Sequence, residues 1–265
     1  MSAHISLQAR VDDYLAERRR LGFALINMGQ ALASFAHHVA EVHHRGPLTT
    51  EVMAEWARQD KGNRGTRHTW AKRLKQLRPF TRYLRQFDPR TEVPDESVFG
   101  PVRGRVAPHI YREEEIVDLL AAARKLGPND GLRPATFATL FGLIASTGMR
   151  ISEALGLLDA DVDLKYGMLT IRQTKFAKSR QLPLHPTTIA ALERYRHERI
   201  RHVRNTPEMR FFIGSRGRLL GQPLSDRQAH RVFNELCGQL GWVNRGAHDG
   251  PRIHDLRHSF SRCDG

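Results

Sequence analysis

Hydrophobic residues recur every three to four positions through the first 90 residues, which is the period of one buried helix face. The periodic stretches cover residues 7–21, 24–42, 49–57 and 66–87. The third stretch begins at Thr49 or Thr50, and threonine is a good helix N-cap. Four short amphipathic helices predict a small helical bundle over residues 1–90.

The helical pattern breaks near residues 88–110, where proline, glycine and acidic residues interrupt it. Gly100-Pro101 and Pro108 favour turns and disfavour helix. We therefore predict a linker over residues 91–108, between a helical domain at 1–90 and a second domain at 109–265.

After the linker, helical periods alternate with short β-type runs. Residues 168–171 and 180–184 predict the two strands of a hairpin, and residues 211–213 predict a third short strand. Helices are predicted to begin near residues 111, 135, 152, 186, 225 and 253. The second half is therefore mainly α-helical and of the α+β class, with a small antiparallel sheet.

Charge narrows the class of partner. The 265 residues include 42 Lys+Arg and 28 Asp+Glu, a formal net charge of +14, with +7 in residues 1–108 and +7 in residues 109–265. This excess favours a polyanion. The sequence has no apolar run long enough for a membrane span, and its two cysteines make no disulfide scaffold. We expect a cytoplasmic, nucleoid-associated protein with double-stranded DNA as partner; the alternative is basic residues spread over solvated faces.

The most basic segment is residues 58–90, with eleven Lys or Arg and two acidic residues. The apolar stripe of the helix predicted at 66–87 faces inward, so its basic face points to solvent. Such a face suits phosphate contacts. The candidate DNA-binding residues are Arg64, Arg67, Lys72, Arg73, Lys75, Arg78 and Arg82. The alternative is an exposed helix that serves only solubility.

Two segments of the second half carry residues that suit a phosphate. Arg150 follows a glycine turn and lies at the start of a helix, where free backbone N–H groups favour an anion. Glu153 is close enough in sequence to orient the guanidinium of Arg150. Lys175 or Lys178 lies in or near the turn of the predicted hairpin, from which a lysine can reach a phosphate.

A third segment contains His254 and Arg257, which share one helical face. Two arginines can neutralise phosphate oxygens while a lysine or histidine moves protons. Such a set permits phosphoryl transfer by charge stabilisation, so no metal and no cofactor is expected.

Together these segments resemble those of the tyrosine recombinases, the phage-integrase family of site-specific DNA recombinases. The matching motifs are Thr147-Gly148-Met149-Arg150 with Ser152-Glu153-Ala154-Leu155, Thr174-Lys175 with residues 179–184, and His254-Asp255-Leu256-Arg257-His258. The resemblance implies an α-helical core-binding domain with a SAM-like four-helix bundle. It also implies a catalytic domain of the DNA breaking-rejoining enzyme fold.

The resemblance implies a role for each site residue. Arg150 and Arg257 would stabilise the pentacoordinate phosphorus of the transition state. Lys175, with Lys178 as the competing candidate, would donate a proton to the leaving 5′-oxygen. His254 would assist proton transfer on the attacking side, and the carboxylate three residues after the first arginine would support that arginine.

The family's nucleophile is a tyrosine beyond the second arginine, which forms a 3′-phosphotyrosyl intermediate. Here eight residues follow Arg257, and all five tyrosines precede His254. We expect a C-terminally truncated recombinase from a mobile element, which binds DNA but does not cleave it alone. It would form a homotetramer or a mixed assembly with a full-length recombinase. The alternative is a non-catalytic DNA-binding accessory or regulatory protein derived from a recombinase.

Overall fold

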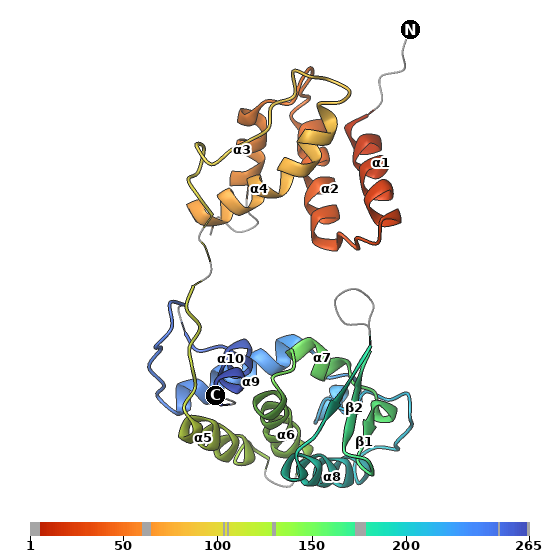
Figure 1. Ribbon diagram of the computed structural model, residues 1–265, viewed down its shortest axis with the longest axis vertical. Helices are drawn as coiled ribbons and strands as arrows, with labels where there is room; N and C mark the ends of the chain where they lie inside the picture. Colours follow the sequence, from red (N-terminus) through yellow and green to blue (C-terminus); the bar gives the residue numbers. More distant parts are fainter. Residues whose placement is uncertain are drawn as a thin grey trace. The chain divides into compact units, whose positions relative to one another are not determined.

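The computed structural model describes residues 6–59, 65–102, 104, 106–128, 131–172, 179–248 and 250–263, with side chains up to residue 260. The chain divides into two compact units, Met1–Arg105 and Val106–Gly265 (Figure 1). Each unit has its own hydrophobic core.

Four helices form most of unit 1: α1 (Leu7–Arg20), α2 (Ile26–Glu41), α3 (Thr50–Arg58) and α4 (Arg67–Leu84). The side chains of Ser6, Thr49 and Thr66 accept hydrogen bonds from backbone N–H groups in the first turns of α1, α3 and α4. These caps define where the three helices begin. The buried faces meet in an aromatic core, in which the ring centroids of Phe35 and Trp56 are 5.5 Å apart.

Residues 91–102, which the composition assigns to a linker, pack on the helices of unit 1. Phe99 is buried there and lies against Trp70, with ring centroids 5.7 Å apart. Glu92 donates its backbone N–H to Leu48 (2.9 Å), and its carboxylate accepts from the backbone N–H of Thr50 (2.6 Å). The packed part of unit 1 therefore extends further along the chain than the proline content of this segment indicates. The buried Phe99 side chain and the hydrogen bonds of Glu92 hold the segment against the helices.

Unit 2 contains six helices of a turn or more among the described residues: α5 (Glu113–Arg124), α6 (Leu132–Thr147), α7 (Ile151–Gly156), α8 (Pro186–Ile200), α9 (Asp226–Gln239) and α10 (Ile253–Cys263). Two short 3₁₀ turns, η1 (Asp159–Asp161) and η2 (Gly217–Leu219), complete its helical elements. Its strands are β1 (Val162–Asp163), β2 (Met168–Ile171) and β3 (Arg180–Pro183).

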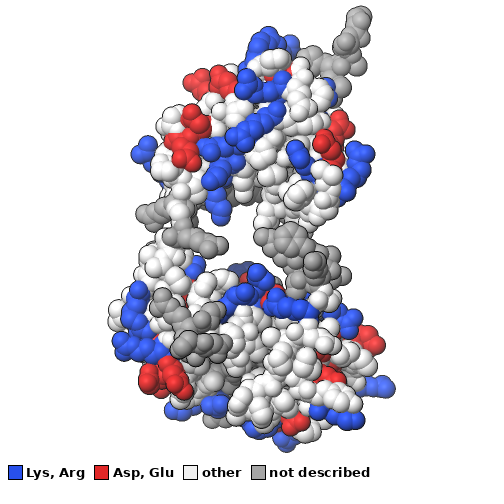
Figure 2. Space-filling model, in the orientation of Figure 1, with Lys and Arg blue, Asp and Glu red and all other residues white. Residues whose placement is uncertain are grey.

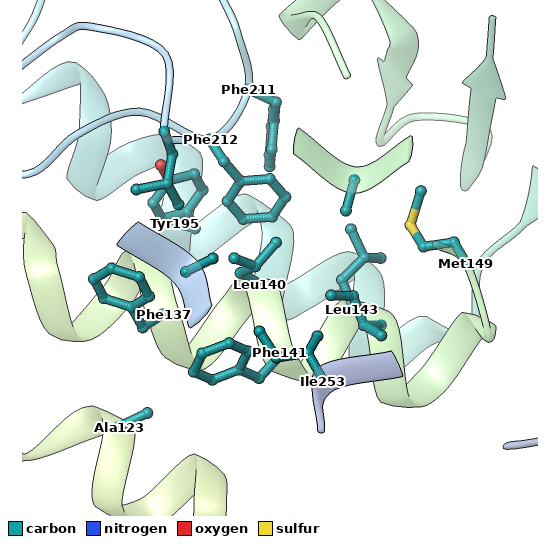
Figure 3. Close-up of a cluster of buried hydrophobic side chains, with 14 of the residues drawn as sticks. Ala123, Phe137, Leu140, Phe141, Leu143, Met149, Tyr195, Phe211, Phe212 and Ile253 are labelled. Carbon is teal, nitrogen blue, oxygen red and sulfur yellow. The ribbon is translucent and has the colours of Figure 1, made fainter. Parts of the chain in front are cut away.

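Helix α6 is the centre of unit 2. It packs against α5, α8 and α10, and its residues Leu140 and Phe141 are fully buried. Figure 3 shows three side chains gathered around Leu140 and Phe141: Tyr195 from α8, Ile253 from α10, and Phe212 from the segment between α8 and α9. A helix with partners on several sides keeps little solvent-facing surface, which explains its nearly uniform apolar sequence.

The sheet is antiparallel, with the order β1-β2-β3. Ile171 pairs with Arg180, so β2 and β3 form the expected hairpin. Residues 211–213 do not form the predicted strand. Ile213 makes only an isolated bridge to Pro223, and all three side chains are fully buried in the core. Burial, and not pairing in the sheet, explains this apolar run.

Candidate phosphate-binding site and nucleic-acid interface

Arg150 follows a left-handed turn at the end of α6. Gly148 has φ +60°, a conformation that glycine adopts without strain. Met149 is 1% exposed and anchors the next position in the core. Arg150 is the N-cap residue of α7, and its side chain is 43% exposed. The turn thus fixes the backbone in the interior and leaves the guanidinium at the surface.

One carboxylate, that of Glu153, binds two arginines. It accepts hydrogen bonds from the backbone N–H of Arg150 (2.8 Å) and from Arg150 Nη1 (2.9 Å). It also accepts from Nη2 of Arg180, the first residue of β3, at 3.0 Å. The Glu153 side chain is 9% exposed, whereas that of Arg180 is 42% exposed. Sequence spacing indicates the contact of Glu153 with Arg150, but it gives no sign of Arg180, which lies 27 residues further on.

Burial alone would raise the pKa of the Glu153 carboxyl. Hydrogen bonds from the backbone and side chain of Arg150, and the positive charges of Arg180 and Arg150, outweigh burial and bring the pKa below its ordinary value. Glu153 is therefore ionised at neutral pH. Because it carries one negative charge against two guanidinium groups, the cluster remains positive and attracts anions.

The two candidate lysines, Lys175 and Lys178, lie outside the described residues. Their described flanks are informative. Ile171, which ends β2, pairs with Arg180, which begins β3, and Arg180 binds Glu153. The two strand ends between which the lysines occur in sequence are therefore fastened to the α7 side of unit 2.

Helix α10 carries the other two candidates. Ile253 and Asp255 are fully buried. The Asp255 carboxylate accepts from the backbone N–H of Arg252 (3.1 Å) and from its Nη2 (2.8 Å), which fixes the start of the helix. His254, between Ile253 and Asp255, is exposed, and Arg257, two residues after Asp255, is half-buried.

His254 is exposed but its ring is partly covered, and this partial burial is the main cause that lowers its pKa. The positive charges of His258, Arg252 and Arg257 lower it further, against a smaller opposite effect of Asp255. The ring centroids of His254 and His258 are 5.1 Å apart. A neutral imidazole has one ring nitrogen with a free lone pair, so His254 is suited to accept a proton near pH 7.

The turn before Arg150 contacts α10 directly. A Cβ atom on Gly148 would lie 2.7 Å from Cδ1 of Phe260, so the residue at this position must be small as well as left-handed. Through this contact the structure brings the Arg150–Glu153–Arg180 group and the helix of His254 and Arg257 into one region of unit 2.

In unit 1, three exposed basic residues lie on one face of α4. Lys72, Lys75 and Arg82 are exposed, and their spacings of three and seven residues place them on the same side of the helix. Arg67 is exposed at the first position of α4, and Arg64 lies outside the described residues. Figure 2 shows Lys and Arg side chains over much of the visible face of this unit.

Arg73 and Arg78, also candidates for DNA contact, have partners within unit 1. Arg73 donates to the carbonyl oxygen of Gln59, and its guanidinium lies 4.5 Å from the centre of the Trp56 ring. Arg78 has a side chain that is 20% exposed and lies 3.8 Å from Glu96. Both side chains pack against their own unit, so they are not part of the exposed face of Lys72, Lys75 and Arg82, and their contact with DNA stays a prediction.

A second basic surface, which sequence analysis missed, lies on unit 2. A cavity of about 400 Å³ is lined by four arginines, Arg133, Arg216, Arg218 and Arg231. Arg133 is paired with Glu235 at 3.0 Å, and the other three are exposed. They come from three separate segments, with Arg133 on α6, Arg216 and Arg218 around η2, and Arg231 on α9, so no local run of charge reveals all four.

Within the described ranges, no group of three or more His, Cys, Asp or Glu side chains is arranged to bind a metal ion. No helix in this part of the chain has both the length and the apolar character needed to cross a membrane.

Residues 110–263 match the family described as the Phage integrase family. The chain belongs to this family of tyrosine recombinases. It is 39% identical over 258 residues to an integrase/recombinase of Sinorhizobium fredii, y4rB, covering 95% of this chain and 79% of that protein. It is 35% identical over 210 residues to the tyrosine recombinase XerD of Caulobacter vibrioides, covering 77% of this chain and 64% of that protein.

Solved recombinase structures share the fold. A lambda integrase dimer bound to a COC′ core site superimposes with a TM-score of 0.64 at 17% identity, covering 97% of this chain and 89% of that one. The mostly helical unit 2 with its small antiparallel sheet has the fold of an integrase catalytic domain.

Of the five tyrosines of this recombinase, Tyr14 and Tyr83 belong to unit 1, and Tyr111, Tyr166 and Tyr195 belong to unit 2. Tyr14, Tyr111 and Tyr195 are buried, and Tyr83 is half-buried on α4. Burial raises the pKa of Tyr111 and Tyr195 above the ordinary value. Tyr166 is 72% exposed, but it precedes β2, whereas Arg180 pairs with the last residue of that strand.

Proposed function

We propose that this chain binds double-stranded DNA and holds a backbone phosphate in the manner of a tyrosine recombinase in site-specific recombination or integration. The observation that carries the proposal is the Arg150–Glu153–Arg180 group beside α10. The half-exposed guanidinium of Arg150 is held by the Glu153 carboxylate, which Arg180 also binds, so the remaining N–H donors of Arg150 are available to an anion.

The chemistry of the site follows from its residues. Arg150 and Arg257 would donate to the non-bridging phosphate oxygens and stabilise the charge that grows on them during transfer. His254, neutral near pH 7, would accept a proton from the attacking hydroxyl. Lys175, or Lys178 in its place, would return a proton to the leaving 5′-oxygen. In the transfer itself the attacking oxygen forms a new bond to phosphorus while the bond to the 5′-oxygen breaks; the residues named here supply the proton transfers and the charge stabilisation of that step.

Unit 1 would act as the core-binding domain, a four-helix bundle that contacts the DNA backbone through α4. Lys72, Lys75 and Arg82 share an exposed face, and lysine and arginine side chains on one face can track successive phosphates. The family relationship supports this role.

We also propose that a polypeptide of these 265 residues does not cleave DNA on its own. Covalent catalysis needs a nucleophile at the phosphate that the arginines bind. Three of the five tyrosines are buried, and Tyr83 is half-buried among the aromatic rings of unit 1. Tyr166 precedes β2, whereas Arg180 pairs with the last residue of that strand. A partner subunit with its own tyrosine would complete the reaction.

Such a partner would be a second recombinase in a dimer or tetramer on DNA. Solved relatives of this fold include a lambda integrase dimer on a core site and a lambda integrase tetramer on a Holliday junction. A homotetramer of this chain would have the same architecture on DNA, but only a mixed assembly with a full-length recombinase would also supply the tyrosine.

Fluorescence anisotropy with a labelled DNA duplex tests the binding proposal, and a nicked suicide duplex run on a denaturing gel tests cleavage. We expect the logarithm of the association constant for DNA to fall linearly with the logarithm of the salt concentration. In the cleavage assay we expect no covalent protein–DNA adduct until a full-length recombinase is added. Absence of binding at low salt contradicts the proposal. An adduct formed by this chain alone contradicts the cleavage-deficient state.

A further inference from the structure

Arg180 connects two parts of the site that are far apart in sequence. Its Nη2 donates to Glu153 Oε2 at 3.0 Å, the oxygen that also accepts the backbone N–H of Arg150 at 2.8 Å. The other oxygen, Oε1, accepts from Arg150 Nη1 at 2.9 Å. The carboxylate is thus held from one side by α7 and from the other by β3.

This second grip matters because the Arg150–Glu153 pair is local. An ion pair three residues apart with a half-exposed arginine contributes little on its own, since its side chains retain other rotamers in water. Arg180 comes from a different element and restricts the Glu153 carboxylate to one position. With the carboxylate restricted, Arg150 has a fixed acceptor for Nη1.

The position of Arg180 in the hairpin adds to this role. It is the first residue of β3 and pairs with Ile171, the last residue of β2. A second arginine, Arg172, directly follows Ile171 at the end of β2. It pairs with Asp161, whose side chain is 2% exposed. Both strand ends are therefore tied to buried carboxylates, but only the carboxylate bound by Arg180 also binds Arg150.

We infer that Arg180 is a positioning residue that orients the Arg150 guanidinium through Glu153 and couples the β2–β3 hairpin to the phosphate site. The value of this orientation for DNA rests on the proposed function, but the orientation itself belongs to the protein alone. The two can therefore be tested separately.

The first test uses the free protein. NMR relaxation of the Arg150 Nε–Hε group would be compared in the wild type, in Arg180→Met and in Arg172→Met. We expect Arg150 to be ordered in the wild type and in Arg172→Met, and mobile in Arg180→Met, with partial recovery in Arg180→Lys. An equally ordered Arg150 in Arg180→Met overturns the inference. Thermal unfolding of each variant establishes that it is folded.

The second test is a double-mutant cycle on duplex affinity. Arg180→Met should weaken binding about tenfold when Arg150 is present, and have little effect when Arg150 is already methionine. Arg172→Met, which removes the same charge from the same hairpin, should cost about twofold in both backgrounds. Independent losses from Arg180 and Arg150 would show that Arg180 contacts the phosphate itself, and would overturn the positioning role. If the wild type binds no DNA, the proposed function fails, and the NMR comparison still decides the inference.

Discussion

The two basic regions of this recombinase present their charges in opposite ways. On α4, Lys72, Lys75 and Arg82 extend into solvent, and no ion pair to them is found among the described residues. At the start of α7, Arg150 is fixed by a buried turn on one side and by Glu153 on the other. The first region can follow any phosphate backbone, whereas the second is organised before a ligand arrives.

This difference predicts two kinds of DNA contact. Solvated lysines gain affinity mainly by releasing counterions, so their contribution falls steeply with salt. A pre-positioned arginine loses less side-chain entropy on binding and can place its donors at one defined oxygen. We therefore expect unit 1 to contribute general attachment to DNA and unit 2 to contribute the chemistry.

The largest expected effect is on the turn that presents Arg150. Gly148→Val would place a β-branched residue at φ +60° and a Cβ atom against Phe260. We expect the free energy of unfolding of unit 2 to fall by about 3 kcal/mol or more, measured by chemical denaturation.

The matched control is Gly238→Ala. Gly238 lies within α9, its φ is not positive, and a Cβ atom there meets nothing within 4 Å. Alanine should leave stability unchanged or raise it by up to about 1 kcal/mol. Equal stabilities of the two variants would contradict the claim that the turn is constrained.

A smaller effect is expected from the exposed face of α4. Replacement of Lys72, Lys75 and Arg82 together by methionine should weaken duplex binding by about tenfold at physiological salt. The slope of the logarithm of the association constant against the logarithm of salt concentration should become shallower by about 2–3. Anisotropy titrations at several salt concentrations measure both. An unchanged slope would show that α4 does not face the DNA.

The smallest effect concerns Glu153 and pH. The pKa of Glu153 is lower in the folded state than in the unfolded chain. The ionised carboxylate therefore stabilises the fold fully when the pH is above the unfolded-state pKa, and this stabilisation is lost as the pH falls through the folded-state pKa. Glu153→Gln should therefore be less stable than the wild type by about 1 kcal/mol at pH 7, with the gap closing in acid. Urea titrations at pH 7 and at low pH measure it; a gap that does not depend on pH would contradict an ionic role.

Local sequence predicted most helices and the β2–β3 hairpin because their apolar periods and caps are encoded within a few residues. It failed where tertiary packing decided the outcome. Phe99 buries a segment that its prolines assign to a linker, and Phe211 and Phe212 fill the core without joining the sheet. The pairing of Glu153 with Arg150 follows from spacing. Arg180 reaches the same carboxylate only through the fold, so no local pattern reveals it.

The phosphate site at Arg150 is tested most directly by the duplex affinity of Arg150→Met relative to that of Arg124→Met. Arg124 is an exposed arginine at the end of α5, so its removal changes the net charge equally. We expect Arg150→Met to weaken duplex binding about tenfold and Arg124→Met to change it by less than about twofold. Equal affinities of the two variants would contradict a phosphate site at Arg150.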